Sequence, residues 1–169
     1  MRPTVSIMAI AVCAGLLVGC GKSQTTASST GAPGEAAPAA PPAGPTPEQA
    51  KAMIASMPAP YNTADLVNGK DKFAQCRACH TTAEGGPNMT GPNLWGIFGR
   101  KAGSLDSFAY SDGLKAAGWT WDAARIDKWI TDPRAVIPGT KMTFFGIRDP
   151  KDRADVIAYL KTQTTPPPK

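Results

Sequence analysis

One short run of residues constrains this chain more than any other feature. Cys76 and Cys79 are separated by two residues and are followed directly by His80, which gives the pattern C-x-x-C-H. Two thiols at this spacing lie on one turn of a helix, where each can add to a vinyl group of the same porphyrin. The adjacent imidazole then lies beneath the metal. The pattern therefore predicts one covalently attached c-type haem, with two thioethers from Cys76 and Cys79 and an iron ligand from His80.

Two other kinds of site contain C-x-x-C, namely a redox-active dithiol and half of a zinc site. The dithiol is expected where a strand leads into a helix, and the zinc site needs two further Cys or His ligands. His80 is the only histidine of the chain, and the remaining cysteines, Cys13 and Cys20, lie near the N-terminus. The sequence therefore disfavours both alternatives.

The first 19 residues have the pattern of an export signal, in which Arg2 precedes an apolar run over residues 5–18. Leu17-Val18-Gly19-Cys20 resembles a bacterial lipobox, which implies cleavage after residue 19 and a lipid on Cys20. An uncleaved transmembrane anchor is disfavoured, because about 14 apolar residues fall short of the roughly 20 that span a bilayer. We therefore expect a lipid anchor that holds the chain on the periplasmic side of a bacterial membrane, with the inner membrane favoured.

Composition divides the rest of the chain. Residues 20–60 consist mainly of Gly, Ala, Pro, Ser and Thr, which cannot bury a core and predict a disordered linker. Within it, Thr46-Pro47-Glu48 can cap and start a short helix, which we expect to form only transiently. The globular domain is expected over residues 61–163, followed by a flexible tail at residues 164–169.

Helical patterns recur along the expected domain. The first helix is predicted over residues 64–75 and runs into the haem attachment turn. Gly69 in its middle costs about 1 kcal/mol relative to Ala, which indicates that another helix crosses closely there. The predicted partner is the last helix, which Asp149-Pro150 begin. Shorter helices are expected over residues 111–117 and 122–131, so the predicted fold class is all-α.

A haem held by one histidine leaves its sixth iron position to another side chain. Met142 is the leading candidate, because it lies far downstream of His80 in a stiff loop, Pro138-Gly139-Thr140-Lys141-Met142. Met89 is the alternative, although it is close in sequence to His80. The remaining candidates, Met53 and Met57, lie on the expected linker.

Three motifs together resemble the mitochondrial and alphaproteobacterial class I cytochrome c over about residues 69–161. They are Thr90-Gly91-Pro92-Asn93-Leu94, Phe98-Gly99-Arg100-Lys101 and the loop that ends at Met142. The resemblance implies the class I fold, with the first and last helices crossing beside a covalent haem. It also implies a carrier of single electrons rather than an enzyme.

The same resemblance implies roles for individual residues. The Pro92 carbonyl would accept the second ring hydrogen of His80, and Phe144 would cover the exposed haem edge. The partners of the haem propionates would be Arg100, Tyr110, Trp121 and Thr140. Two positions depart from the family, because Trp129 replaces a Tyr that reaches the Met sulfur and Leu114 replaces an Asn beside an internal water. These changes imply a drier pocket, a Met sulfur without its hydrogen bond and a net rise in redox potential.

Charge indicates the partners. The formal net charge is +5, and basic residues match or neighbour positions around the haem edge of the family, namely Lys70, Lys72, Lys101, Lys141 and Lys151. We expect a monomer that meets acidic docking patches, with a quinol:cytochrome c oxidoreductase as donor and a terminal oxidase as acceptor. No motif indicates nucleic-acid binding. The rival functions are a haem peroxidase and a gas-binding haem protein, which need a displaceable sixth ligand and a distal acid–base residue.

Overall fold

The computed structural model describes residues 44–168, which form six α-helices, one short 3-10 helix and no strand. An isolated antiparallel bridge joins Lys101 to Thr120. None of the helices in this described range is long and apolar enough to cross a membrane. The all-α fold class is therefore confirmed. The residues of the expected signal peptide and of the expected lipid anchor, Cys20, lie outside the described range.

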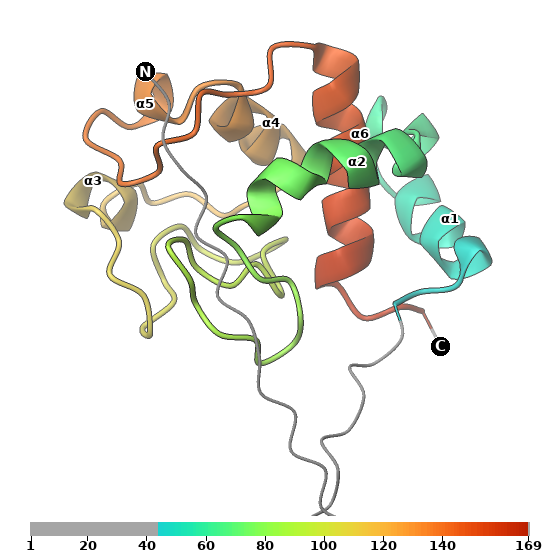
Figure 1. The fold of residues 1–169 in the computed structure, drawn as a ribbon, viewed down its shortest axis with the longest axis horizontal. Helices are drawn as coiled ribbons and strands as arrows, with labels where there is room; N and C mark the ends of the chain where they lie inside the picture. The colour runs from blue at the N-terminus through green and yellow to red at the C-terminus, as the bar shows by residue number, and fades with distance from the viewer. Residues whose placement is uncertain (1–43, 169) are drawn as a thin grey trace, which may run out of the picture. The chain divides into compact units, whose positions relative to one another are not determined.

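The helices follow in the order shown in Figure 1. Their bounds are α1 Pro47–Ala55, η1 Tyr61–Thr63, α2 Leu66–Arg77, α3 Asp112–Lys115, α4 Ala123–Thr131, α5 Pro133–Val136 and α6 Pro150–Thr164. Carboxylates of Asp65, Asp122 and Asp149 accept backbone N–H groups at the starts of α2, α4 and α6. Helix α5 was not predicted; it begins directly after α4, with Asp132 as its cap.

The centre of the fold is the crossing of α2 over α6, which Figure 1 shows in green and red. Gly69 of α2 lies at the contact, where a Cβ atom would overlap the backbone carbonyl of Asp155 and lie 2.9 Å from the Cβ of Tyr159. The crossing predicted from this glycine is therefore confirmed. On α6, Val156, Ile157 and Leu160 are buried and contribute to the core.

A buried carboxylate ties the two crossing helices together. Asp155 is 2% exposed, and its oxygens accept hydrogen bonds from Asp65 N (2.9 Å), Asn68 Nδ2 (2.7 Å) and Lys151 Nζ (2.6 Å). Burial on its own raises the pKa of this carboxyl group, but the bonds from Lys151, Asn68 and Asp65 together hold that pKa below its usual value. The network therefore favours the ionised carboxylate in the folded state.

This network predicts a loss of stability in acid. Because the folded pKa of Asp155 lies below the unfolded value of about 3.9, its stabilisation is present above about pH 5. It declines as the pH falls through the folded value. We expect Asp155→Asn to lower the free energy of unfolding at pH 7 by about 2 kcal/mol, since Lys151 loses its charged partner. Denaturant unfolding between pH 3 and 7 should show a shallower pH dependence for the variant than for the parent.

The expected boundary at residue 61 is wrong, because α1 belongs to the folded domain. Thr46 and Gln49 form a reciprocal capping box at its start. The buried side chains of this segment are Ala50, Met53, Ile54 and Met57, each between 6% and 8% exposed. Helix α1 packs on α6 and η1. A helix with so few apolar residues has only marginal stability on its own. It is stable here because its apolar side chains pack on the apolar surface of α6.

The expected tail also begins too early. Thr164 is the last residue of α6 and is fully buried, and its hydroxyl donates to Leu160 O at 2.8 Å. The carbonyl of Thr164 accepts a hydrogen bond from Gly96 N at 2.8 Å. The end of α6 is therefore held by the loop that follows the C-x-x-C-H motif.

Candidate functional site

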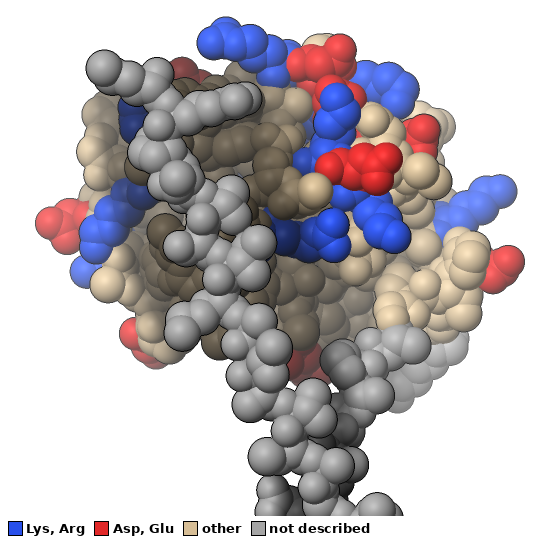
Figure 2. Space-filling model, viewed as in Figure 1, with Lys and Arg blue, Asp and Glu red and all other residues tan. Residues whose placement is uncertain are grey.

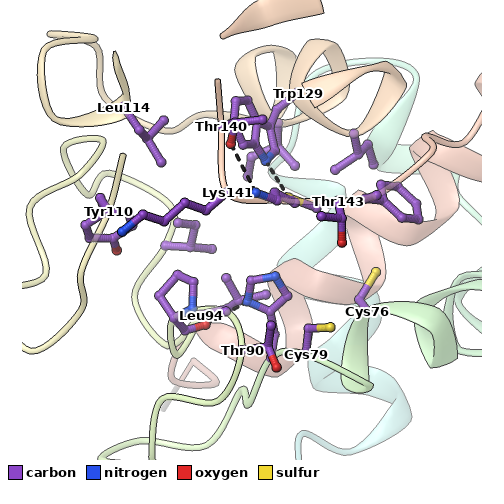
Figure 3. A pocket seen from close by; sticks show the side chains of 18 of the residues that line it. Cys76, Cys79, Thr90, Leu94, Tyr110, Leu114, Trp129, Thr140, Lys141 and Thr143 are labelled. Atoms are coloured by element: carbon purple, nitrogen blue, oxygen red, sulfur yellow. Dashed lines mark hydrogen bonds between the residues drawn. The ribbon is translucent and has the colours of Figure 1, made fainter. Parts of the chain in front are cut away.

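The C-x-x-C-H residues form the end of α2 and the turn after it. Cys76 lies in the last turn of the helix, and its carbonyl accepts backbone hydrogen bonds from both Cys79 and His80, each at 3.0 Å. This tight turn places the two thiols and the imidazole side by side. Figure 3 shows both thiols on one side of a cavity, with Trp129, Thr140 and Leu114 on the other side.

The structure brings every site residue predicted within the described range to the lining of this one cavity. They are Cys76, Cys79, His80, Pro92, Arg100, Tyr110, Trp121, Thr140, Met142 and Phe144. Further residues of the lining are mainly apolar and include Leu94, Ile97, Leu114, Ile126 and Leu160. The position of each residue agrees with its predicted role, while the roles themselves stay predictions.

The His80 ring is fixed by its surroundings. Its Nδ1 lies 2.7 Å from the carbonyl oxygen of Pro92, which can only accept, so Nδ1 carries the hydrogen and Nε2 has the free lone pair. Burial lowers the pKa of His80, with a smaller opposing contribution from the Pro92 hydrogen bond. Gly91 lies against the ring, where a Cβ atom would be 2.7 Å from Nδ1 and 2.8 Å from Nε2. A neutral, oriented imidazole with a free Nε2 is suited to bind a metal.

The cysteines do not have the properties of a redox-active dithiol. Burial, with a smaller contribution from Cys79, raises the pKa of the Cys76 thiol to about 11. Reactive dithiols instead have a depressed pKa that keeps one sulfur as thiolate. Within residues 44–168 there is also no cluster of three His, Cys, Asp or Glu side chains that would hold a metal ion directly. A metal at His80 therefore needs a cofactor that supplies most of its ligands.

These residues fit a covalent haem. The thiols of Cys76 and Cys79 face the cavity from one turn, the Nε2 of His80 is free, and the thioether of Met142 lines the same cavity. An apolar lining suits a porphyrin, and donors such as the half-buried Arg100 and the buried Tyr110 suit its carboxylates. When bound, haem supplies an iron that cycles between the ferric and ferrous states.

The comparisons with known proteins agree with this fit. The sequence profile of the family described as cytochrome c matches residues 66–164. The chain belongs to the cytochrome c family. A cytochrome c2 of Rhodomicrobium vannielii is 48% identical over 103 residues, which are 61% of this chain and 82% of that protein. A cytochrome c2 of Blastochloris viridis is 43% identical over 109 residues, 64% of this chain and 86% of that protein.

A similar protein is also found in another organism. A cytochrome c of the plant Stellaria longipes is 41% identical over 105 residues, which are 62% of this chain and 97% of that protein. Members of this family carry haem c covalently, which confirms the predicted cofactor, and they are electron carriers. Helix α1 lies before the range that the family profile matches in this cytochrome c.

One expectation about the sixth ligand is wrong. The replacement of Tyr by Trp129 was expected to leave the Met142 sulfur without a hydrogen bond. The structure instead places Nε1 of Trp129 3.1 Å from Sδ of Met142, and the indole N–H donates to the sulfur (Figure 3). The indole N–H of Trp129 can only donate a hydrogen bond, and it lies close enough to the sulfur to do so. It therefore takes the place of the Tyr hydroxyl that is found in the family. Leu114 is buried and lines the cavity, so that wall of the pocket is apolar as expected.

The Trp129 bond predicts a measurable effect on the redox potential of this cytochrome c. Trp129→Phe removes the donor, so the sulfur keeps more electron density and favours the ferric state. We expect the midpoint potential to fall by on the order of 20–40 mV, since a difference of about 0.5–1 kcal/mol between oxidation states corresponds to that shift at 59 mV per 1.4 kcal/mol. Trp129→Tyr keeps a donor and should recover most of the loss. Equal potentials for the Phe and Tyr variants in a redox titration would contradict this role.

Arg100 also has a structural role that was not predicted. Its Nη1 and Nη2 donate to the carbonyls of Trp95 and Asn93, each at 3.0 Å. Asn93 is 8% exposed and donates in turn to Thr81 Oγ1 (2.7 Å) and to a further carbonyl of the loop. These bonds hold the segment that presents the Pro92 carbonyl to His80. The motif that contains Asn93 was noted as a family feature, but its hydrogen-bond partners became evident only in the structure.

Some of the predicted docking lysines are engaged within the molecule. Lys72 forms an ion pair with Asp152 at 2.7 Å, and Lys151 forms one with Asp155 at 2.6 Å. Nζ of Lys141 donates to the carbonyl of Ala109 at 2.7 Å. Figure 2 shows basic and acidic side chains interleaved over α2 and the first turns of α6. This face is therefore less uniformly positive than the lysine positions alone indicated.

Proposed function

We propose that this cytochrome c is a membrane-tethered carrier of single electrons on the periplasmic side of a bacterial membrane, with the inner membrane favoured. In this proposal, His80 and Met142 are the axial ligands of one covalent haem c. A monomer takes electrons from a quinol:cytochrome c oxidoreductase and delivers them to a terminal oxidase. The chemistry is a one-electron change at the iron, and the protein acts by binding, orienting and shielding that iron.

The observation that carries the proposal is the position of the Met142 thioether. It lines the same cavity as His80 and accepts a hydrogen bond from the buried Trp129 at 3.1 Å. A sulfur held in this way is a poor candidate for displacement, and Met/His ligation favours the ferrous state and a high potential. Both properties suit a carrier that exchanges electrons without binding a substrate at the metal.

The rival functions, a haem peroxidase and a gas-binding haem protein, need a vacant or easily vacated sixth position. They also need an acid–base side chain beside that position. His80 is the only histidine of the sequence, and the wall around Met142 includes Leu114, Ile126 and Ile130. This lining offers no second histidine for proton transfer, which favours the carrier.

A visible spectrum of the purified full-length protein tests the assignment. A carrier with an intact Met ligand should show the weak ferric sulfur-to-iron band, and its ferrous spectrum should not change when carbon monoxide is added at neutral pH. A rapid and complete shift with carbon monoxide would overturn the carrier assignment in favour of the gas-binding or peroxidase reading. Haem staining of a denaturing gel should also show that the cofactor remains with the chain.

The tether predicts a separate result. If Cys20 carries the lipid, Cys20→Ala should move the protein from the membrane fraction to the periplasmic fraction or block its processing, with the haem spectrum unchanged. The physical reason is that acyl chains supply most of the membrane affinity of a lipoprotein. A variant that is processed normally and still fractionates with membranes would show that Cys20 is not the anchor. Membrane extraction and immunoblotting provide the measurement.

A further inference from the structure

Phe145 is an aromatic side chain in an unusual position. It is 88% exposed, whereas its neighbour Phe144 is partly buried and packs against the hydrophobic core. Both residues line the mouth of the cavity that contains the C-x-x-C-H motif. Exposing an aromatic ring of this size to water forgoes about 2 kcal/mol of burial energy. Exposed aromatic groups beside a functional cavity are typical of surfaces that bind another molecule.

The loop that carries Phe145 is anchored on both sides. Before it, the Met142 sulfur accepts the Trp129 N–H, and Met142 N donates to Thr140 Oγ1 at 3.3 Å. After it, Ile147 is buried and its N–H donates to Ile130 O at 2.8 Å. The backbone of Phe145 is therefore held between two fixed points. Because this backbone is already ordered, covering the ring costs only the freedom of its two side-chain torsions, which makes Phe an efficient anchor.

Two cationic residues lie on either side of Phe145 in the sequence of this loop. Lys141 and Arg148 are both exposed, and Lys141 is held in place by its bond to Ala109 O at 2.7 Å. The carboxylate of Asp149, the nearest acidic group along the chain, is occupied as the cap of α6, where it accepts from Lys151 N and Asp152 N. The loop thus carries an exposed apolar ring together with two exposed cationic residues. Its complement is an apolar recess bordered by carboxylates.

We propose that Phe145 is the apolar anchor of the surface on which this protein docks an acidic redox partner. The partner surface that fits it is a protein face with an apolar recess surrounded by Asp and Glu. The proposal rests on the proposed electron-carrier function and names the short-range contact that function needs. Long-range attraction between the charges brings the two proteins together, and burial of the Phe145 ring keeps them in the productive orientation.

The test compares full-length Phe145→Ser with the parent as substrates of two detergent-solubilised complexes, a bacterial quinol:cytochrome c oxidoreductase and a bacterial terminal oxidase. We expect the second-order rate constant of the variant to be about tenfold lower with at least one complex, which is the size of effect typical of an aromatic hot spot. The loss should persist at high ionic strength, because salt screens charges and leaves apolar contact intact. Phe145→Leu should recover part of the rate.

Val67→Ser is the matched control, because Val67 is also highly exposed, at 72%, but lies on α2 outside the cavity lining. It should react like the parent with both complexes, and all variants should share the parent's visible spectrum, potential and rate of reduction by dithionite. If the parent reacts with a complex and Phe145→Ser reacts with it equally fast at every ionic strength, the docking proposal is overturned and the proposed function is not. A parent that reacts with neither complex would overturn the proposed function and the docking surface together.

Discussion

Met142→Ala is expected to have the largest effect on the haem of any single substitution within the described residues. Removing the thioether should abolish the weak ferric sulfur-to-iron band and let carbon monoxide bind the ferrous protein readily. The midpoint potential should fall by on the order of 0.2 V, because axial ligands set haem potentials over a span of about 0.8 V. Visible spectra with and without carbon monoxide, together with a redox titration, provide the measurement.

Met89→Ala is the matched control for this experiment. Met89 is 48% exposed, does not line the cavity and was the alternative ligand in the sequence analysis. Its substitution should change neither the spectrum nor the potential. If Met142→Ala kept the parent's spectrum while Met89→Ala lost the sulfur band, the ligand assignment would be reversed.

Gly69→Ala is expected to have the largest effect on stability. On an exposed helix the change would stabilise the protein by up to about 1 kcal/mol, because Ala favours the helical backbone. At the α2–α6 crossing the added methyl group would overlap the backbone carbonyl of Asp155, which cannot rotate away as a side chain would. The two helices must separate, so we expect a loss of about 3 kcal/mol. For a domain of this size, the loss corresponds to a fall in Tm of roughly 12 °C or more.

The stability of the holoprotein can be measured by thermal denaturation followed at the haem absorbance and by far-UV circular dichroism. Asp71→Ala is the control, because Asp71 is exposed on the same helix. Its unfolding free energy should remain within about 0.5 kcal/mol of the parent. A Gly69→Ala variant as stable as the parent would show that the helices can move apart at little cost, contrary to the close approach seen here.

Local patterns were sufficient to predict much of this fold. The C-x-x-C-H turn needs only the helical repeat to bring two thiols and an imidazole together. The caps at Asp122 and Asp149 bond to their own first turns, so they are visible from neighbouring residues in the sequence. Gly69 indicated a helix crossing, because a glycine within a helix is costly unless a close contact requires it. Each of these features depends on residues that are close in sequence, or is indicated by a single residue.

Contacts between distant segments were not predictable in the same way. Helix α1 has a weak apolar pattern of its own and is stabilised by the surface of α6, so its residues were predicted to belong to a linker. Two of the expected docking lysines are engaged within the molecule, in different ways. Lys151 pairs with Asp155 four residues along α6, a spacing that is visible in the sequence. Lys72 of α2 pairs with Asp152 of α6, and only the packing of these two helices shows that its charge is paired.

At the functional site, the surroundings of Met142 likewise combine features that the sequence predicts with features that depend on tertiary packing. The sequence by itself determined which residues could bind the haem, because one histidine, two thiols at fixed spacing and a methionine in a stiff loop leave few alternatives. It did not determine that Trp129 would donate to the Met142 sulfur, since that bond depends on the direction of an indole ring on α4 relative to a separate loop. The direction of a buried side chain is decided by the packing around it, and this packing exists only in the tertiary structure.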